Sequence, residues 1–217
     1  MGLLPQRLGL PRGRSALPES EVSASQRGRI MQGVIDEVAE VGYARATVAG
    51  ITRRARVSRT TFYQSFSDKE DCFAQAYVLM SAQIHDLIIA RAGAVDDAAW
   101  QDRIEAGVQA LVDSLEAMPS YARSYMVEVH GAGDTLLRQR DIVMERHARS
   151  LLLVAKLARA AAVPVREPRD LEAIGAIGAT AELIARAVRR CGRDGQLSLQ
   201  EIVAPVVTIQ SAVIRGE

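Results

Sequence analysis

The sequence is poor in aromatic residues and cysteine and has no long apolar run, and each shortage narrows the class of protein. Aromatic residues make up 4% of the 217 residues, whereas alanine, leucine, valine, isoleucine and arginine recur throughout. Because strands are rich in aromatic and β-branched side chains, this bias favours packed helices over sheets. No apolar run approaches the roughly 20 residues that span a bilayer, and no secretory signal is recognisable. We therefore expect a cytoplasmic all-α protein with no membrane partner.

Patterns that mark metal sites and common catalytic centres are also missing. Cys72 and Cys191 lie far apart without CxxC spacing, which favours free thiols in a reducing compartment. The three histidines, His85, His130 and His147, lack the spacing of a metal site. Neither a glycine-rich phosphate loop nor a GxSxG elbow occurs. The sequence thus predicts no metal, no cofactor and no catalytic residue, although a helical enzyme stays an alternative.

Charge is distributed unevenly, although the whole chain carries a net charge of only +1. Residues 1–70 hold 11 Lys/Arg and 7 Asp/Glu, whereas residues 71–217 hold 16 and 19. A basic N-terminal part on an acidic body is typical of a local polyanion site, although chance fluctuation produces the same pattern.

The first 24 residues contain prolines and glycines and show no apolar period, which predicts a disordered arm over 1–24. The composition favours a solvated tail, with contacts from Arg7, Arg12 and Arg14 to DNA phosphates as the alternative. A helical period starts at Ser25, with apolar residues at i, i+4, i+8 and i+11, and Gly42 is expected to end this helix. These apolar residues are Ile30, Val34, Val38 and Val41.

Two short helices follow the first one, and together the three predict a helix-turn-helix over 25–70. Thr47 is suited to cap the second helix and Ser58 the third, with the turn at Arg56 and Val57. Phe62 and Phe66 of the third helix are expected to point inward. Such a helix fits the major groove of DNA, where its first residues reach base edges while the preceding helix braces it.

The residues of this segment are more specific than its helix pattern. The stretch GYARATVAGITRRARVSRTTFYQSFSDKEDCF resembles the DNA-binding domain of the TetR/AcrR family of bacterial regulators, over about Gln26 to Tyr77. The resemblance implies a ligand-responsive transcription regulator, usually a repressor, that binds a palindromic operator as a homodimer. One departure is Arg56, where the family usually has glycine; a positive φ there strains any other residue.

Chemistry and the resemblance together suggest a set of DNA-contacting residues. Thr47 is expected to bind phosphate through its hydroxyl and amide, and Arg59 and Thr60 are expected to read bases. The resemblance places Tyr63 and Lys69 on phosphates; the alternatives are a core aromatic for Tyr63 and a solvated capping-box residue for Lys69. The full predicted set is Thr47, Arg56, Ser58, Arg59, Thr60, Thr61, Tyr63, Gln64 and Lys69.

Residues 71–217 are expected to form a helical ligand-binding and dimerisation domain, entered by a continuous helix from Asp68 through Ile88. Two capping boxes are predicted, at Ser67 with Glu70 and at Ser198 with Glu201. The resemblance implies that helices 169–190 and 198–215 pair with a second subunit as a four-helix bundle. The stripe Ile202, Val206, Ile209 and Val213 suits such a seam, with the core of the same chain as the alternative.

The ligand pocket is expected among helices between Trp100 and about Leu157. Its candidate lining residues are Trp100, Tyr121, Tyr125, Met126, His130, Met144 and His147. The scarcity of charge among them favours a mostly apolar small-molecule effector. A helical small-molecule-binding protein that does not bind an operator is a further alternative, against which Arg59, Tyr63 and Lys69 argue.

Overall fold

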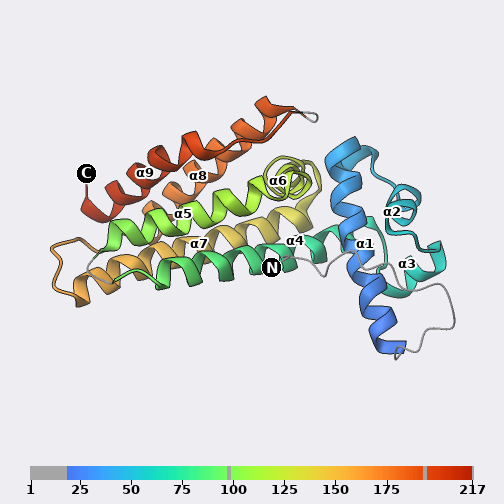
Figure 1. The fold of residues 1–217 in the computed structure, drawn as a ribbon, viewed down its shortest axis with the longest axis horizontal. Helices are drawn as coiled ribbons and strands as arrows, with labels where there is room; N and C mark the ends of the chain where they lie inside the picture. The colour runs from blue at the N-terminus through green and yellow to red at the C-terminus, as the bar shows by residue number, and fades with distance from the viewer. Residues whose placement is uncertain (1–18, 97–98, 193–194, 217) are drawn as a thin grey trace.

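The computed structural model describes residues 19–96, 99–192 and 195–216, and these form helices without any strand, as the sequence predicted (Figure 1). Helices α1 to α3 form a unit at one end of an elongated body, and α8 and α9 lie on the far side of the body from α4. The helices are α1 (Glu19–Val41), α2 (Val48–Ala55), α3 (Arg59–Ser65), α4 (Lys69–Gly93), α5 (Trp100–Glu116), α6 (Pro119–Met126), α7 (Asp134–Ala160), α8 (Asp170–Cys191) and α9 (Val203–Arg215), with 3-10 helices at Tyr43–Arg45, Glu128–Gly131 and Gln200–Ile202.

Helix α1 begins at Glu19, six residues before the predicted start at Ser25. The predicted arm therefore loses residues 19–24 to the first turns of α1. The rest of that arm, including its three arginines, lies outside the described residues. An early start is compatible with the sequence because residues 19–24 contain neither proline nor glycine.

The predicted apolar stripe of α1 forms the core of the N-terminal unit. Ile30, Val34 and Val38 have no exposed surface, and they share one buried cluster with residues of α2 and α3. Helix α2 packs so closely on α1 that a Cβ on Gly33 would lie 2.9 Å from the Ile51 carbonyl oxygen. Gly42 caps the 3-10 helix that follows α1 with a φ of 84°, which glycine adopts without a Cβ clash.

The start of α4 differs by one residue from the predicted capping box. Asp68, not Ser67, is the N-cap, and its carboxylate accepts a hydrogen bond of 2.8 Å from the Asp71 backbone N–H. Asp71 in turn accepts from the Ser67 backbone N–H at 3.0 Å. The box of Ser67 with Glu70 is therefore wrong, because aspartate caps a helix as well as serine does and an equivalent acid lies three residues after it.

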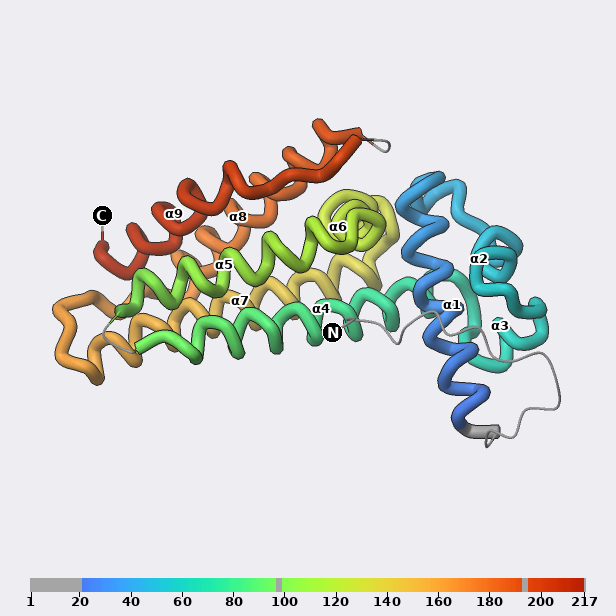
Figure 2. Tube along the Cα trace, in the orientation of Figure 1, coloured from blue at the N-terminus to red at the C-terminus, as the bar shows by residue number. Residues whose placement is uncertain are grey.

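Helix α4 carries the chain from the N-terminal unit into the body (Figure 2). An 18-residue window of α4 has a mean hydropathy of 1.2, so by length and composition alone this helix could cross a membrane, although Ser81, Gln83 and Asp86 interrupt its apolar run. Phe73, Tyr77, Met80 and Ile84 are nevertheless buried, and α4 packs against α1, α5 and α7. Burial in a helical core accounts for the same apolar composition.

Helix α8 lies within one residue of its predicted range, whereas α9 differs from the prediction in its start and in its buried face. Helix α9 begins at Val203 rather than 198, because Glu116 of α5 accepts hydrogen bonds from the Leu199 backbone N–H and the Gln200 amide in place of a local capping box at Ser198 and Glu201. Ile202 and Val206 of the predicted seam are 8% and 0% exposed. Both belong to the core of their own chain, which was the alternative interpretation.

Candidate nucleic-acid interface and ligand cavity

The two short helices of the N-terminal unit begin at the predicted caps. Thr47 Oγ1 accepts a hydrogen bond of 3.0 Å from the Gly50 backbone N–H, and Ser58 Oγ accepts one of 3.0 Å from the Thr61 N–H. The Ser58 and Thr61 hydroxyl oxygens also lie 2.9 Å apart. These bonds satisfy amides that a helix start leaves without an intrahelical partner, so they define where α2 and α3 begin.

Helix α3 presents its predicted base-reading residues to solvent. Arg59, Thr60 and Gln64 are exposed, whereas Phe62 is fully buried. Tyr63 is 58% exposed and touches Phe62 only edge-on, with ring centroids 5.3 Å apart. The core alternative for Tyr63 is therefore excluded, and its hydroxyl is free to reach a phosphate.

Lys69 has a structural task that the sequence did not indicate. Its Nζ donates hydrogen bonds of 3.0 Å to the carbonyl oxygens of Tyr43 and Ala46, and it lies 4.5 Å from the centre of the Tyr43 ring. Because an ammonium has three N–H groups, one is left for a phosphate. Lys69 is thus not a merely solvated residue, and its phosphate contact stays a prediction.

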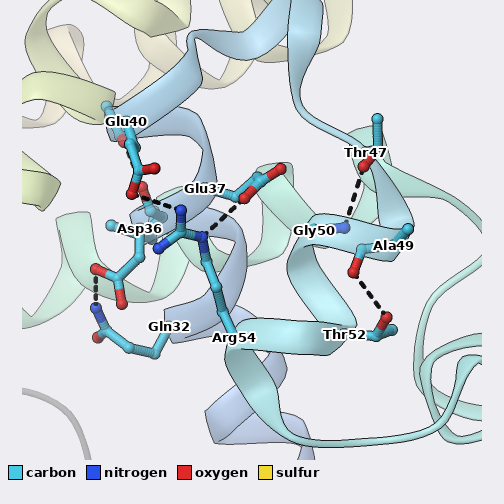
Figure 3. A network of polar contacts seen from close by, with 11 residues as sticks. Gln32, Asp36, Glu37, Glu40, Thr47, Ala49, Gly50, Thr52 and Arg54 are labelled. Carbon is cyan, nitrogen blue, oxygen red and sulfur yellow. Dashed lines mark hydrogen bonds and ion pairs between the residues drawn. The ribbon is translucent and has the colours of Figure 1, made fainter.

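Burial divides the arginines of α2 into two groups that sequence reasoning did not separate. Arg53 and Arg56 are exposed, so Arg53 joins the predicted cations of this surface. Arg54 instead turns toward α1, where it bonds Glu37 at 2.7 Å and Glu40 at 2.6 Å (Figure 3). The helical period would have indicated that Arg54 turns inward, because it lies about one turn after the buried Ile51 on the same side of α2.

Arg27 of α1 is a further residue that the sequence analysis passed over. Its guanidinium donates to the Ser65 carbonyl at 2.9 Å and to the Gln75 side chain, and it lies 4.4 Å from the centre of the Phe66 ring. One cation thereby holds α1 against the end of α3 and the first turns of α4. Nothing in the local sequence around Arg27 points to partners so far along the chain.

A cavity of about 100 Å³ lies among α4, α5, α6, α7 and α8. Five of the seven predicted lining residues border it, namely Tyr125, Met126, His130, Met144 and His147. The lining residues that the sequence did not predict come from four helices: Tyr77 of α4, Leu111 of α5, Arg140 of α7, and Ile177, Gly178, Thr180, Ala181, Glu182, Ile184 and Ala185 of α8.

Two predicted residues do not border the cavity, and one helix was missed. Trp100 is buried at the start of α5, with the Arg215 guanidinium 5.9 Å from its ring centre. Tyr121 is also buried, and it stacks on Tyr125 with centroids 5.0 Å apart. The sequence prediction assigned α8 to dimerisation alone, so it included none of the α8 residues that line the cavity.

Burial keeps the cavity histidines neutral. The His147 and His85 Nδ1 atoms lie 3.4 Å apart. Burial, helped by His85 and Arg146, lowers the pKa of His147 to about 3. Burial and the neighbouring Arg140 also lower the pKa of His130. Since each positive neighbour disfavours a second positive charge, this region carries its charge on arginine rather than on histidine.

Known proteins resemble the N-terminal unit of this chain in sequence. A family model described as "Bacterial regulatory proteins, tetR family" matches residues 30–76, which cover most of the helix-turn-helix. The HTH-type transcriptional regulator BetI of Klebsiella pneumoniae (strain 342) is 24% identical over 110 residues, which are 51% of this chain and 56% of the relative. The N-terminal unit of this chain is thus similar to the DNA-binding domain of the tetR family. The match thus spans about half the length of the curated relative.

Solved structures share the fold of this chain over nearly their whole length. The fatty acid degradation regulator FadR of Bacillus halodurans superposes with a TM-score of 0.75 at 19% identity, over 88% of this chain and 96% of that one. FadR of Bacillus subtilis, in complex with stearoyl-CoA, has a TM-score of 0.71 at 16% identity, over 87% and 98%. The likeness therefore extends beyond the DNA-binding domain to the helical body.

The departure from the TetR pattern at Arg56 has the geometry that the sequence predicted. Arg56 ends α2 in the left-handed region, with φ 54° and ψ 49°. Replacing it by Gly should raise the free energy of unfolding by about 0.5–1 kcal/mol, because the left-handed strain of about 1–2 kcal/mol outweighs the added backbone entropy of glycine. The same change should weaken DNA binding, because it removes an exposed cation.

Urea denaturation and salt-dependent fluorescence anisotropy with duplex DNA measure the two effects of Arg56→Gly. The matched control is Arg53→Gln, which removes a neighbouring exposed cation without relieving strain, so its stability should stay near that of the unmodified chain. A lower stability for Arg56→Gly would contradict the strain assigned to this turn.

Proposed function

We propose that this chain is a ligand-responsive transcription regulator, acting as a cytoplasmic repressor that binds a palindromic operator as a homodimer. One observation carries the proposal: an exposed recognition-helix start at Arg59 and Thr60 is joined by one continuous helix, α4, to Tyr77 in the cavity wall. A DNA-reading surface and a ligand-sized cavity therefore share a rigid element, which is the requirement for one site to influence the other.

Two connections support coupling between the cavity and the DNA-binding unit. Tyr77 of α4 stacks on Tyr125 of α6 with centroids 4.7 Å apart, and both border the cavity. Helix α6 and the residues after it also touch the unit directly: Ser124 Oγ donates to the Ile35 carbonyl at 3.0 Å, and Glu128 accepts from the Tyr43 backbone N–H at 3.1 Å. A ligand that shifts Tyr125 would thus act on α4 and on α1.

The cavity meets α4 in the half of the helix nearer the DNA-binding unit. Tyr77 lines the cavity, whereas Ile84, Leu87 and Ile88 in the far half do not. By linkage, any factor by which ligand weakens operator binding must equal the factor by which operator weakens ligand binding, typically about 5–150-fold.

The proposed dimer uses α8 and α9 through their solvent-facing sides. Ala204, Pro205 and Thr208 of α9 are exposed, and so is Gly175 of α8, where an added Cβ would meet nothing within 4 Å. Small residues on an exposed helix face let a second helix approach closely. A dimer also supplies the second recognition helix that a palindromic operator requires.

Selection of bound duplexes from random DNA, followed by Arg59→Ala, tests the function. Arg59→Ala should weaken the selected operator by roughly 10–100-fold, about 1–3 kcal/mol, and relax the preference at one position per half-site. Arg149→Ala, an exposed arginine on α7, is the control and should change nothing. A uniform loss on all sequences would make Arg59 a phosphate contact. Absence of salt-dependent binding to any duplex would overturn the function and favour a helical ligand-binding protein or enzyme.

A further inference from the structure

The cavity contains a cation without a close ionic partner. Arg140 lines it, and its nearest ion pair among the described residues is with Asp141, at 3.8 Å. The Asp141 side chain is 72% exposed, so water weakens this pair. Glu182 is the one carboxylate among the described lining residues, and its side chain pairs with Arg189 at 2.6 Å. The positive charge of Arg140 is therefore left largely uncompensated where it borders the cavity.

A second arginine reinforces this charge from behind the cavity wall. Arg146 of α7 has a buried Nε atom with no hydrogen-bond partner. Its charge is felt by groups that do border the cavity, since it helps to lower the pKa of His147 and counters the burial that raises the pKa of Tyr125. A buried donor without a hydrogen-bond partner destabilises a folded protein unless an acceptor approaches it.

Most of the other lining residues are apolar. Leu111, Met126, Met144, Ile177 and Ile184 come from four helices, whereas Tyr77, Tyr125, His130, His147 and Thr180 add polar atoms. An apolar chain fits the apolar part of this lining, whereas a small inorganic anion would leave it unfilled. The cavity thus combines a weakly paired cation with a largely apolar wall.

We propose that this cavity binds an amphipathic anion, with Arg140 as the counter-ion of its head group and its apolar tail between α5, α7 and α8. The inference rests on the proposed function only for the ligand's role as effector. It adds an anionic head group to the expected mostly apolar effector, because a neutral ligand would leave Arg140 with only its water-exposed pair to Asp141. A carboxylate and a phosphate monoester share this chemistry, and both form paired hydrogen bonds with a guanidinium.

Calorimetry of the full chain, without DNA, tests the head group with four probes that share one tail: decanoate, decyl phosphate, decanol and decyltrimethylammonium. We expect at least one of the two anions to bind about tenfold or more tightly than decanol, and the cation not to bind. The tighter anion identifies the head group. Equal affinities of decanol and both anions, or no binding of any probe, would overturn the proposal.

Substitutions on α7 test the named arginines. Arg140→Met should weaken the preferred anion about tenfold or more and leave decanol unchanged. Arg140→Lys should recover only part of the loss, because it keeps the charge but cannot form the paired hydrogen bonds. Arg149→Met is the matched control, since Arg149 is exposed and pairs with Glu145 at 3.0 Å. Equal losses for the anion and decanol in Arg140→Met would overturn the role of Arg140.

Arg146→Met separates a binding role from a structural one. Removing the buried Nε–H that has no partner should raise the melting temperature of the ligand-free protein, and removing the positive charge should weaken binding of the anion. A lower melting temperature with unchanged anion affinity would overturn the part assigned to Arg146. These calorimetry experiments contain no DNA, so their outcome does not depend on operator binding. If the chain binds the anion but no duplex, the proposed function is overturned and the inferred anion site stands.

Discussion

Replacing Arg54 by Met is expected to destabilise the helix-turn-helix by about 3 kcal/mol and to abolish operator binding. The Glu37 side chain is 6% exposed, and its carboxylate depends on the Arg54 guanidinium 2.7 Å away. Removing one partner of a buried ion pair leaves an uncompensated charge, at a cost of roughly 3–5 kcal/mol for a fully buried pair. Glu37 has little room to move, because a Cβ on Gly50 would lie 1.8 Å from its Oε1 (Figure 3).

Two further variants isolate the buried pair. Glu40→Gln removes the other carboxylate on Arg54, but the Glu40 side chain is 65% exposed, so the loss should be below about 1 kcal/mol. Arg54→Met combined with Glu37→Met should recover most of the stability, since no charge is then left buried. Urea denaturation followed by circular dichroism, with anisotropy for operator binding, measures all three. An Arg54→Met variant as stable as the Glu40→Gln variant would mean that water reaches Glu37.

Replacing Thr208 by Arg is expected to convert the proposed dimer to monomer and to weaken operator binding about a hundredfold or more. Ala204, Thr208 and Ala212 are spaced four residues apart, so they share one side of α9. An arginine on this small-residue side would hold a partner helix away and place a charge in the seam. A monomer then has one recognition helix, and it loses the gain in effective concentration that joining two half-site contacts provides.

Light scattering reports the oligomeric state of Thr208→Arg, and anisotropy reports operator affinity. Thr208 is exposed and its hydroxyl bonds only the Ala204 carbonyl, at 2.9 Å, so the circular dichroism spectrum should not change. Gln101→Arg introduces the same charge at an exposed position of α5 and serves as the control. An undisturbed dimer with unchanged operator affinity would move the interface away from this side of α9.

Features that depend on neighbouring residues were predictable from the sequence. The stripe of Ile30, Val34 and Val38, the caps at Thr47 and Ser58, and the left-handed turn at Arg56 are all as expected. Each arises from interactions within a few residues of the chain. The order of residue types over a few positions indicates each of these features. The indications are apolar residues at the helical period, a hydroxyl three residues before an amide that has no intrahelical partner, and a turn position whose φ favours glycine.

Features that join distant segments were not predictable, because a side chain's partner across the fold leaves no local mark. Lys69 donates to carbonyl groups more than twenty residues earlier, and Glu116 takes the place of the capping box predicted more than eighty residues later. The same residue types without these partners would have behaved as predicted. A tertiary acceptor that is already held in place costs less entropy than ordering a local side chain, so it prevails.

The sequence by itself determined the helical fold class and where the DNA-reading helix begins, because helix periods and caps are local. Only the tertiary structure decided which arginine of α2 turns inward, which residues of α9 are core, and that α8 walls the cavity with Arg140 facing it. These outcomes depend on which helices become neighbours. Burial and charge balance are properties of that packing, and a single helix considered alone does not contain them.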